Sequence, residues 1–269
     1  MSELKIYFAA PIRGDDVNRE HYLSLIENLK SQGTVLTELL WLEEDAKEQL
    51  SDTEIFQRDL QWILSSDIVI AEVSSASLGV GFEAGIAWCA GKPFIGLYKT
   101  DSPRLLSAMI RGNTAFKIIE YTEFQEVVNA LKSIEVHLIE LLEIQYESIE
   151  NELETLLNSF EKAINAHDIV EMKPFFNAHS SAVFVSNRVC GVEEIQEEFQ
   201  SIWQLMSDKI YSTDHLQWVS IGPIQTICTF DFQWEDTEEI LSGKGSIFFS
   251  RTSGSWVISH MHIGEYDMY

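Results

Sequence analysis

The sequence predicts an α/β protein whose first half is a doubly wound parallel sheet of five strands. Short apolar runs alternate with segments of helical periodicity over about 120 residues, the pattern of such sheets. One of these runs, residues 67–73, is apolar and β-branched, as strands covered on both faces are. The second half changes to helices followed by long β-rich stretches. This order is typical of an α+β unit with a curved antiparallel sheet wrapped on a helix.

The elements of the first half follow one another in a regular order. The expected strands are at residues 5–10, 34–38, 67–73, 94–98 and 117–121. Helical periodicity covers residues 19–31. Ser51 and Glu54 form a capping-box pattern that starts a helix leading to the central strand. Another helix is expected behind Ser77, and residues 105–111 form a short helix or an ordered loop.

A segment without glycine or proline, residues 123–167, joins the two halves. Its apolar residues recur at helical spacing, which predicts two consecutive helices or one long one. We place the domain boundary near residue 145, which gives domains at 1–145 and 146–269. In the second domain a helix is expected from residue 191 to about 206. The expected strands and β-rich stretches are at residues 182–185, 215–221, 224–234, 239–251 and 256–263.

The composition excludes several classes of function. The net charge of −25 argues against binding to nucleic acids or anionic membranes. No apolar run approaches the roughly 20 residues that span a bilayer, and the first residues offer no signal peptide, so we expect a cytoplasmic protein. Cys89, Cys190 and Cys228 are far apart, which indicates neither a disulfide framework nor a metal cluster. We therefore expect no metal site.

The segment 77–87 is the strongest candidate for chemistry. Gly79 and Gly81 let the backbone approach a ligand, and the helix N-terminus that follows favours an anion such as phosphate. Glu83 lies just inside this helix. The segment is neither a dinucleotide fingerprint nor a P-loop. The glycines alone are equally compatible with plain packing of a helix on a sheet.

Other polar residues are expected to meet this segment at the carboxyl ends of the strands. They are Arg13 and Gly14 after the first strand and Asp59 on the helix before the central strand, and Tyr22 could turn toward them. Two carboxylates and a tyrosine suit the cleavage of a glycosidic bond through an oxocarbenium-like transition state. From the residues alone, the alternatives are a solvated Glu83 and a surface charge at Asp59.

Several motifs in collinear order over residues 5–121 resemble one known family. They are Ile6-Tyr7-Phe8 with Ile12-Arg13-Gly14, Asp59-Leu60-x-Trp62, Ser77-Leu78-Gly79-Val80-Gly81-Phe82-Glu83 and Ser107-Ala108-Met109-Ile110-Arg111-Gly112. Together they resemble the 2′-deoxynucleoside 5′-phosphate N-hydrolases of the nucleoside 2-deoxyribosyltransferase superfamily. The last two motifs separate this branch from the wider superfamily.

The resemblance implies hydrolysis of 2′-deoxynucleoside 5′-monophosphates to a free base and 2-deoxyribose 5-phosphate. Glu83 would attack C1′ and form a covalent glycosyl ester, with Asp59 handling a proton and Tyr22 orienting sugar and glutamate. The substrate- and phosphate-binding residues would be Arg13, Gly14, Ser77, Gly79, Ser107 and Met109. Ser107 would reach the phosphate of a neighbouring subunit, so a homodimer is implied. A carboxylate nucleophile needs no cofactor.

One departure from the family pattern concerns Pro11. It stands where the N-hydrolases usually have serine, and it removes a hydroxyl and a backbone N–H from the implied phosphate site. The wider transferase branch carries proline there, so a nucleoside 2-deoxyribosyltransferase remains an alternative. A further alternative is a nucleotide-sensing module without catalysis. The sequence leaves open which base the substrate carries and whether its sugar is deoxyribose or ribose.

Residues 147–269 resemble, more weakly, the SnoaL-like branch of the NTF2-like fold, a cone of strands lined by helices. The resemblance rests on residues 165–168, 191–195 and 256–262. Such cones often contain a pocket and often dimerise, which implies a role in binding or oligomerisation. His260 and His262 share one strand face, either as lining of such a pocket or as an ordinary histidine pair.

Overall fold

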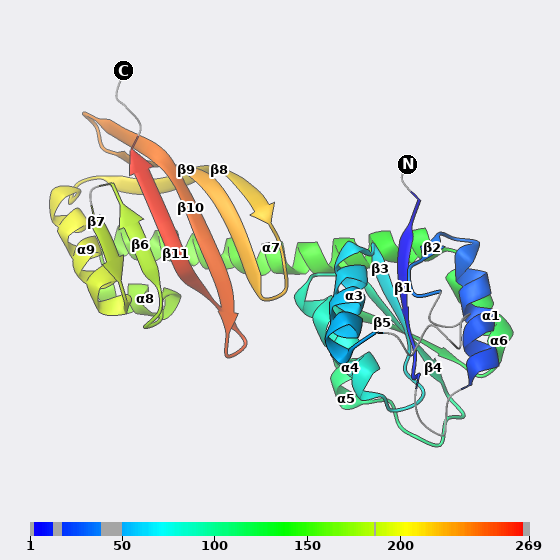
Figure 1. The fold of residues 1–269 in the computed structure, drawn as a ribbon. Coiled ribbons are helices and arrows are strands. Elements are labelled where there is room, and N and C mark those ends of the chain that lie inside the picture. The colour runs from blue at the N-terminus through cyan, green and yellow to red at the C-terminus, as the bar shows by residue number, and fades with distance from the viewer. Residues whose placement is uncertain (1–2, 13–17, 39–49, 186, 266–269) are drawn as a thin grey trace. The chain divides into compact units, whose positions relative to one another are not determined.

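The structure is a computed structural model that describes residues 3–12, 18–38, 50–185 and 187–265. The chain divides into two compact units, Met1–Gln145 and Tyr146–Tyr269 (Figure 1). Each unit has its own β-sheet. No helix in the described part of the chain is long and apolar enough to cross a lipid bilayer.

The first unit contains the predicted parallel sheet of five strands. The strands are β1 (Lys5–Ala9), β2 (Thr34–Val35), β3 (Ile68–Glu72), β4 (Phe94–Lys99) and β5 (Phe116–Tyr121), in the order β2-β1-β3-β4-β5. Strand β2 is shorter than the predicted 34–38. The Thr37 hydroxyl explains this, because it accepts from the N–H of Phe8 and donates to the carbonyl of Phe8, in place of a ladder pair.

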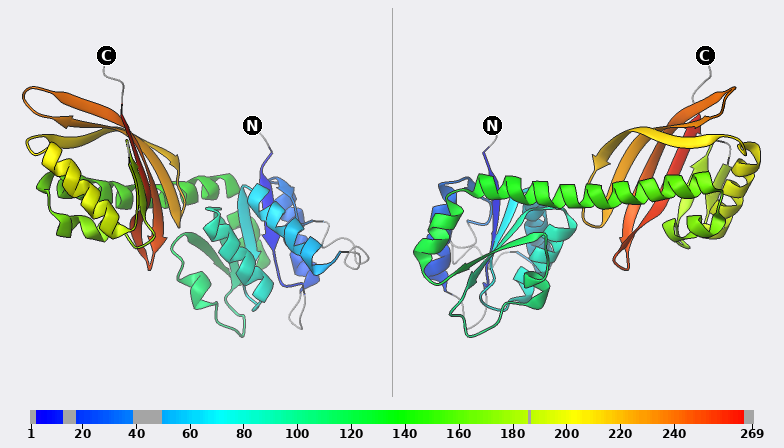
Figure 2. Two further views of the ribbon diagram at one scale, coloured as in Figure 1. Left: turned by 60° about the vertical axis from the view of Figure 1, so that its left-hand side comes forward. Right: turned by 180° about the vertical axis from the view of Figure 1, so that it is seen from behind.

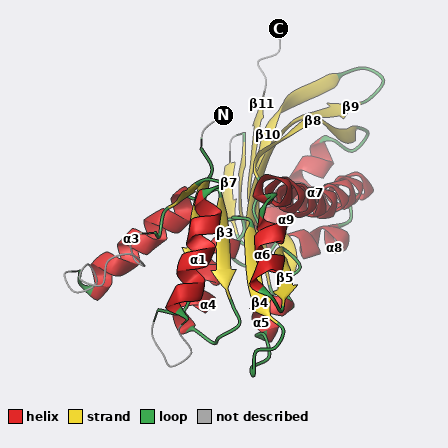
Figure 3. Cartoon of the chain, turned by 90° about the vertical axis from the view of Figure 1, so that its right-hand side faces the viewer, coloured by secondary structure: helices red, strands yellow, loops and turns green. Residues whose placement is uncertain are grey.

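Helices cover both faces of this sheet (red in Figure 3). One face packs on α1 (Arg19–Lys30) and α6 (Phe124–Leu131), and the other packs on α3 (Asp52–Ser65) and α4 (Leu78–Cys89). The short α5 (Ala108–Arg111) precedes β5. Alternation along β1 separates the two cores, since Ile6 and Phe8 face α1 while Tyr7 faces α3 and α4.

The segment without glycine or proline, residues 123–167, forms two consecutive helices, α6 and α7 (Ile134–Ala166). Helix α7 runs past the boundary between the units. Ile134 and Leu141 contribute to the core of the first unit, whereas Leu153, Phe160 and Ile164 contribute to the core of the second. The spacing of apolar residues along this helix is therefore explained by two separate cores.

The second unit is an α+β domain with a curved six-stranded sheet (Figure 2). Its elements are α8 (Ile169–Met172), the 3-10 helix η2 (Lys173–Phe175), β6 (Ser181–Phe184), β7 (Asn187–Cys190), α9 (Val192–Leu205), β8 (Ile210–Ser220), β9 (Gln225–Glu235), β10 (Ile240–Thr252) and β11 (Ser255–Glu265). Strands β8 to β11 form the predicted antiparallel meander, and β6 pairs parallel to β11. The sequence did not predict β7, a four-residue strand with only one buried side chain.

Candidate active site

Glu83 lies on the second turn of α4, and its carboxylate is held by a tyrosine from the sheet. The Tyr7 hydroxyl donates to Glu83 Oε1 over 2.8 Å. Tyr7 is fully buried on β1, so its ring is fixed by the packing between the sheet and α4. Glu83 is half-buried. The Glu83 carboxylate therefore has a defined orientation, at the border between solvent and the core that α3 and α4 form with the sheet.

The environment shifts the acidity of both partners. Burial raises the pKa of Glu83, the hydrogen bond from Tyr7 opposes that rise, and the nearby Asp59 adds to it. Burial and the charge of Glu83 raise the pKa of Tyr7, so the phenol keeps its proton. Tyr7 is therefore a permanent hydrogen-bond donor to Glu83.

Asp59 lies on α3 close enough to Glu83 for the two carboxylates to interact. Arg58 holds it, since Nε and Nη2 lie 2.9 Å and 2.8 Å from the same oxygen, Oδ1. The Arg58 guanidinium also lies 4.7 Å from the ring centroid of Trp62. Burial raises the pKa of Asp59, and Arg58 opposes that rise. Asp59 is thus a positioned carboxyl group whose acidity is set by two opposing influences.

The structure does not bring Tyr22 to Glu83. Tyr22 is buried on α1, in the core on the other face of the sheet. Tyr7 occupies the position expected for it beside the glutamate. The sequence analysis missed Tyr7 and Arg58. The alternation Ile6-Tyr7-Phe8 in a buried strand was the available signal, because it places Tyr7 alone on the face that carries α4.

The predicted phosphate-binding residues are only partly within the described chain. Ser77 is the N-cap of α4, where its hydroxyl accepts from the N–H of Val80 over 3.3 Å. A Cβ built on Gly79 would meet nothing closer than Ser77 Oγ at 3.7 Å, so this turn has space around it. Arg13 and Gly14 lie outside the described residues.

Ser107 and Met109 lie on a separate exposed segment. Ser107 is the N-cap residue of α5, and its side chain makes no capping hydrogen bond. Met109 is 84% exposed. Among the described residues, no hydrogen bond joins Ser107 or Met109 to Glu83 of the same chain.

Large apolar side chains are exposed around this region. Leu78 and Leu105 are 97% and 95% exposed, and Phe56 and Phe82 pack on each other with their ring centroids 6.2 Å apart while remaining largely exposed. They come from α3, α4 and the segment before α5. Phe56 and Phe82 thus form one exposed apolar contact, and exposed apolar patches mark interaction surfaces.

Comparison with known proteins identifies the family. The profile of the nucleoside 2-deoxyribosyltransferase family matches residues 6–166. The chain belongs to this family. A putative 2′-deoxynucleoside 5′-phosphate N-hydrolase 1 of Trichoplax adhaerens is 44% identical over 112 residues, which are 42% of this chain and 78% of that protein. The 5-hydroxymethyl-dUMP N-hydrolase of Danio rerio is 38% identical over 135 residues, which are 48% of this chain and 94% of that protein.

Solved structures resemble the second unit of this family member. A protein with a cystatin-like fold from Nostoc punctiforme has a TM-score of 0.40 at 13% identity and covers 44% of this chain and 90% of its own. An NTF-2 like protein from Shewanella oneidensis has a TM-score of 0.39 at 12% identity and covers 43% of this chain and 98% of its own. The architecture of the unit rests on its own topology, described above.

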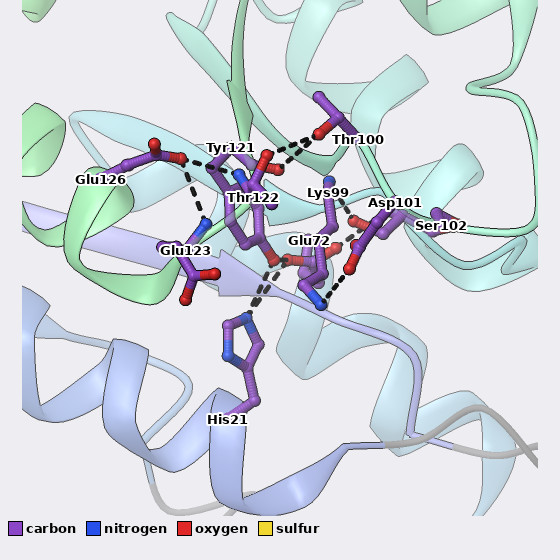
Figure 4. Close-up of polar contacts among 11 residues, drawn as sticks. His21, Glu72, Lys99, Thr100, Asp101, Ser102, Tyr121, Thr122, Glu123 and Glu126 are labelled. Carbon is purple, nitrogen blue, oxygen red and sulfur yellow. Dashed lines mark hydrogen bonds and ion pairs between the residues drawn. The ribbon is translucent and has the colours of Figure 1, made fainter.

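This deoxyribosyltransferase-family chain has a second polar cluster on the opposite face of the sheet, at the carboxyl ends of β3 and β5 (Figure 4). Glu72, the last residue of β3, accepts from the Tyr121 hydroxyl and from the N–H of Ser74, each over 2.8 Å. His21 Nε2 lies 3.0 Å from Tyr121 Oη and 3.7 Å from Glu72 Oε2. These residues and Tyr22 line a cavity of about 500 Å³.

The described residues contain no cluster of potential metal ligands. No group of three or more histidine, cysteine, aspartate or glutamate residues there is arranged to hold a metal ion. His260 Nδ1 instead lies 2.8 Å from Ser181 Oγ. Burial and the neighbouring His262 lower the pKa of His260. His260 is thus bound to the neighbouring strand of its own sheet.

Proposed function

We propose that the first unit hydrolyses the N-glycosidic bond of 2′-deoxynucleoside 5′-monophosphates, releasing the free base and 2-deoxyribose 5-phosphate. The observation that carries the proposal is the Tyr7–Glu83 pair behind a capped, glycine-containing helix start. It provides an oriented carboxylate within reach of an anion-binding helix N-terminus. The names of the N-hydrolase relatives, which are 38% and 44% identical over this unit, support the same reaction class.

In the proposed first step, Glu83 attacks C1′ of the sugar. Tyr7 holds Oε1, which leaves Oε2 to form the new C1′–O bond as the C1′–N bond breaks. Asp59 gives its proton to the departing base, a role that its burial-raised pKa supports. The product of this step is a glycosyl ester on Glu83 and a free base.

In the second step, water resolves the ester. Asp59, now ionised, takes a proton from the water as its oxygen bonds to C1′, and the ester C1′–O bond breaks to return the Glu83 carboxylate. The enzyme ends as it began, with Asp59 protonated and Glu83 ionised. Arg58 holds Asp59 in place during both transfers.

The 5′-phosphate is proposed to lie at the N-terminus of α4, near Ser77 and Gly79. Free N–H groups and the helix dipole favour an anion there. Arg13 and Gly14 are proposed to complete this site. Pro11 is buried at the end of β1 and offers no N–H, which favours a transferase as the second candidate function.

A homodimer is part of the proposal. The exposed apolar residues around Glu83, Leu78 and Phe82 among them, fit a surface that a second copy covers and to which it brings Ser107. Changing Met109 to Glu places a charge beside Ser107, on the segment that the second copy would contribute, and is expected to convert dimers to monomers in sedimentation experiments. The base-release rate should fall together with dimerisation. Ile240→Glu, at an exposed position at the start of β10, is the control and should change neither the oligomeric state nor the rate.

A panel assay tests the reaction. The purified chain is incubated with 2′-deoxynucleoside monophosphates, ribonucleoside monophosphates and nucleosides, with and without an acceptor base. Base released from deoxynucleoside monophosphates without acceptor is the expected result. Reaction only with an acceptor would make the protein a transferase, and saturable binding without any product would make it a nucleotide-sensing module.

A further inference from the structure

The second unit contains a cavity that the proposed hydrolysis does not use. It has a volume of about 250 Å³ and lies between α7 and the strands β8, β9 and β10. Its apolar wall is formed by Leu157, Phe160, Leu216, Phe230 and Ile247. Sites for drug-sized ligands have volumes of roughly 300–1,000 Å³, so this cavity suits a smaller molecule.

Tyr211 supplies a polar group to this cavity. The residue is only 5% exposed, and it lines the cavity from β8. Its backbone is bound to the side chain of Asn165, but its hydroxyl has no hydrogen-bond partner among the described residues. Burial and the nearby Glu161 raise the pKa of Tyr211, so the hydroxyl stays protonated. The hydroxyl is not among the buried side-chain atoms that lack a partner, so it is open to the cavity and free to bond a ligand there.

The rim of the cavity is polar and carries negative charge. Glu154, Asn158 and Glu161 line it from α7, and Thr213, Asp214 and His215 line it from β8. The N–H and hydroxyl of Thr213 both donate to Glu161 Oε2, at 3.0 Å and 2.8 Å, which fixes that carboxylate at the opening. No lysine or arginine is among the lining residues described. Such a rim repels phosphate groups and accepts from N–H donors.

We infer that this cavity binds a free nucleobase. A base is flat, apolar on both faces and rich in N–H donors along its edge, which matches an apolar wall with aromatic rings and a carboxylate rim. It lacks the phosphate that the rim repels. The choice of a nucleobase rests on the proposed function, because the hydrolysis would release this compound. The second unit would then retain or sense one product of the first.

Calorimetric titration of the full chain with adenine, cytosine and 5-hydroxymethyluracil tests the inference. Tyr211→Phe removes only the hydroxyl, and we expect it to weaken base binding by about tenfold. Asn158→Trp, at an exposed position on the rim, fills the opening and should abolish binding. Tyr146→Phe, half-buried elsewhere on α7, is the matched control and should bind as the unmodified chain does.

The outcomes separate this inference from the proposed function. Base release from nucleotides is measured on the same preparations. The inference is overturned if base binding persists in Tyr211→Phe and Asn158→Trp. It is also overturned if only Asp59→Ala removes base binding. Either result places the base in the first unit. Base binding that depends on Tyr211 in a chain without hydrolytic activity overturns the proposed function and leaves the cavity assignment standing.

Discussion

Two tyrosine–glutamate pairs lie on opposite faces of the N-terminal sheet. The hydroxyl-to-carboxylate distance is 2.8 Å in both Tyr7–Glu83 and Tyr121–Glu72. Their other partners differ. Glu72 is 2% exposed and also accepts from the N–H of Ser74, with His21 3.7 Å away. Glu83 is half-buried, and among the described residues Tyr7 is its one hydrogen-bond donor.

This difference explains why the same pairing serves two purposes. Both oxygens of Glu72 have donors, one on Oε1 and one on Oε2, so the carboxylate is stabilised and has no oxygen left for chemistry. Glu83 keeps Oε2 open beside a second carboxyl group, Asp59. We therefore assign reactivity to the face with α3 and α4, and structural support to the face with α1 and α6.

The largest expected effect comes from Glu83→Gln. It keeps the shape of the side chain and removes the nucleophile, so base release should fall by about three or more powers of ten. Chromatography of the reaction mixture measures this rate. Glu72→Gln is the matched control on the other face and should retain turnover in protein that remains folded. Equal loss in the two variants would contradict the distinction between the faces.

Tyr7→Phe should lower the rate by about ten- to a hundredfold, since a hydrogen bond to a charged group contributes roughly 1.5–3 kcal/mol. The pH profile gives a sharper readout. The Tyr7 hydroxyl lowers the pKa of Glu83, so its removal raises that pKa. Glu83 must be ionised to attack, so the acidic limb of the pH–rate profile should move to higher pH. An unchanged acidic limb would show that Tyr7 does not act on Glu83.

Tyr121→Phe should act on stability instead. It leaves the buried Glu72 with one donor fewer, which is expected to cost about 1–3 kcal/mol of unfolding free energy. Urea unfolding followed by circular dichroism measures the change. Turnover per folded molecule should stay close to that of the unmodified chain. A large catalytic defect with normal stability would assign chemistry to this face as well.

Arg58→Gln is expected to have the smallest effect on rate at neutral pH and a clear effect on its pH dependence. Arg58 lowers the pKa of Asp59, so its removal raises that pKa. If Asp59 donates a proton to the base, activity is lost as pH rises through this pKa, and the alkaline limb should move to higher pH. Arg58→Lys, which keeps the charge, should move it less. A shift toward lower pH would argue against Asp59 as the acid.

The sequence could predict the elements that depend on local pattern. Apolar runs and helical periodicity predicted the parallel sheet and the helices around it, and the motifs singled out Glu83, Asp59 and Ser77. Tyr7 was missed because a tyrosine in a buried strand resembles core, and the packing of β1 against α3 and α4 shows which face it reaches. Strand β7 is too short for an alternation pattern.

Contacts between distant segments could not be predicted. The cavity of the second unit depends on α7 lying against β8, where Thr213 bonds to Glu161 across 52 positions of sequence. These features are set by tertiary packing, which leaves no signature in residue spacing.

Trapping the intermediate tests the central claim most directly. The full chain is mixed with a 2′-deoxynucleoside 5′-monophosphate, quenched in acid within milliseconds to seconds, digested and analysed by mass spectrometry. We predict a 2-deoxyribose 5-phosphate adduct on the peptide that contains Glu83, absent from the Glu83→Gln variant. An adduct on another residue, or undiminished base release by Glu83→Gln, would contradict the assignment of Glu83 as the nucleophile.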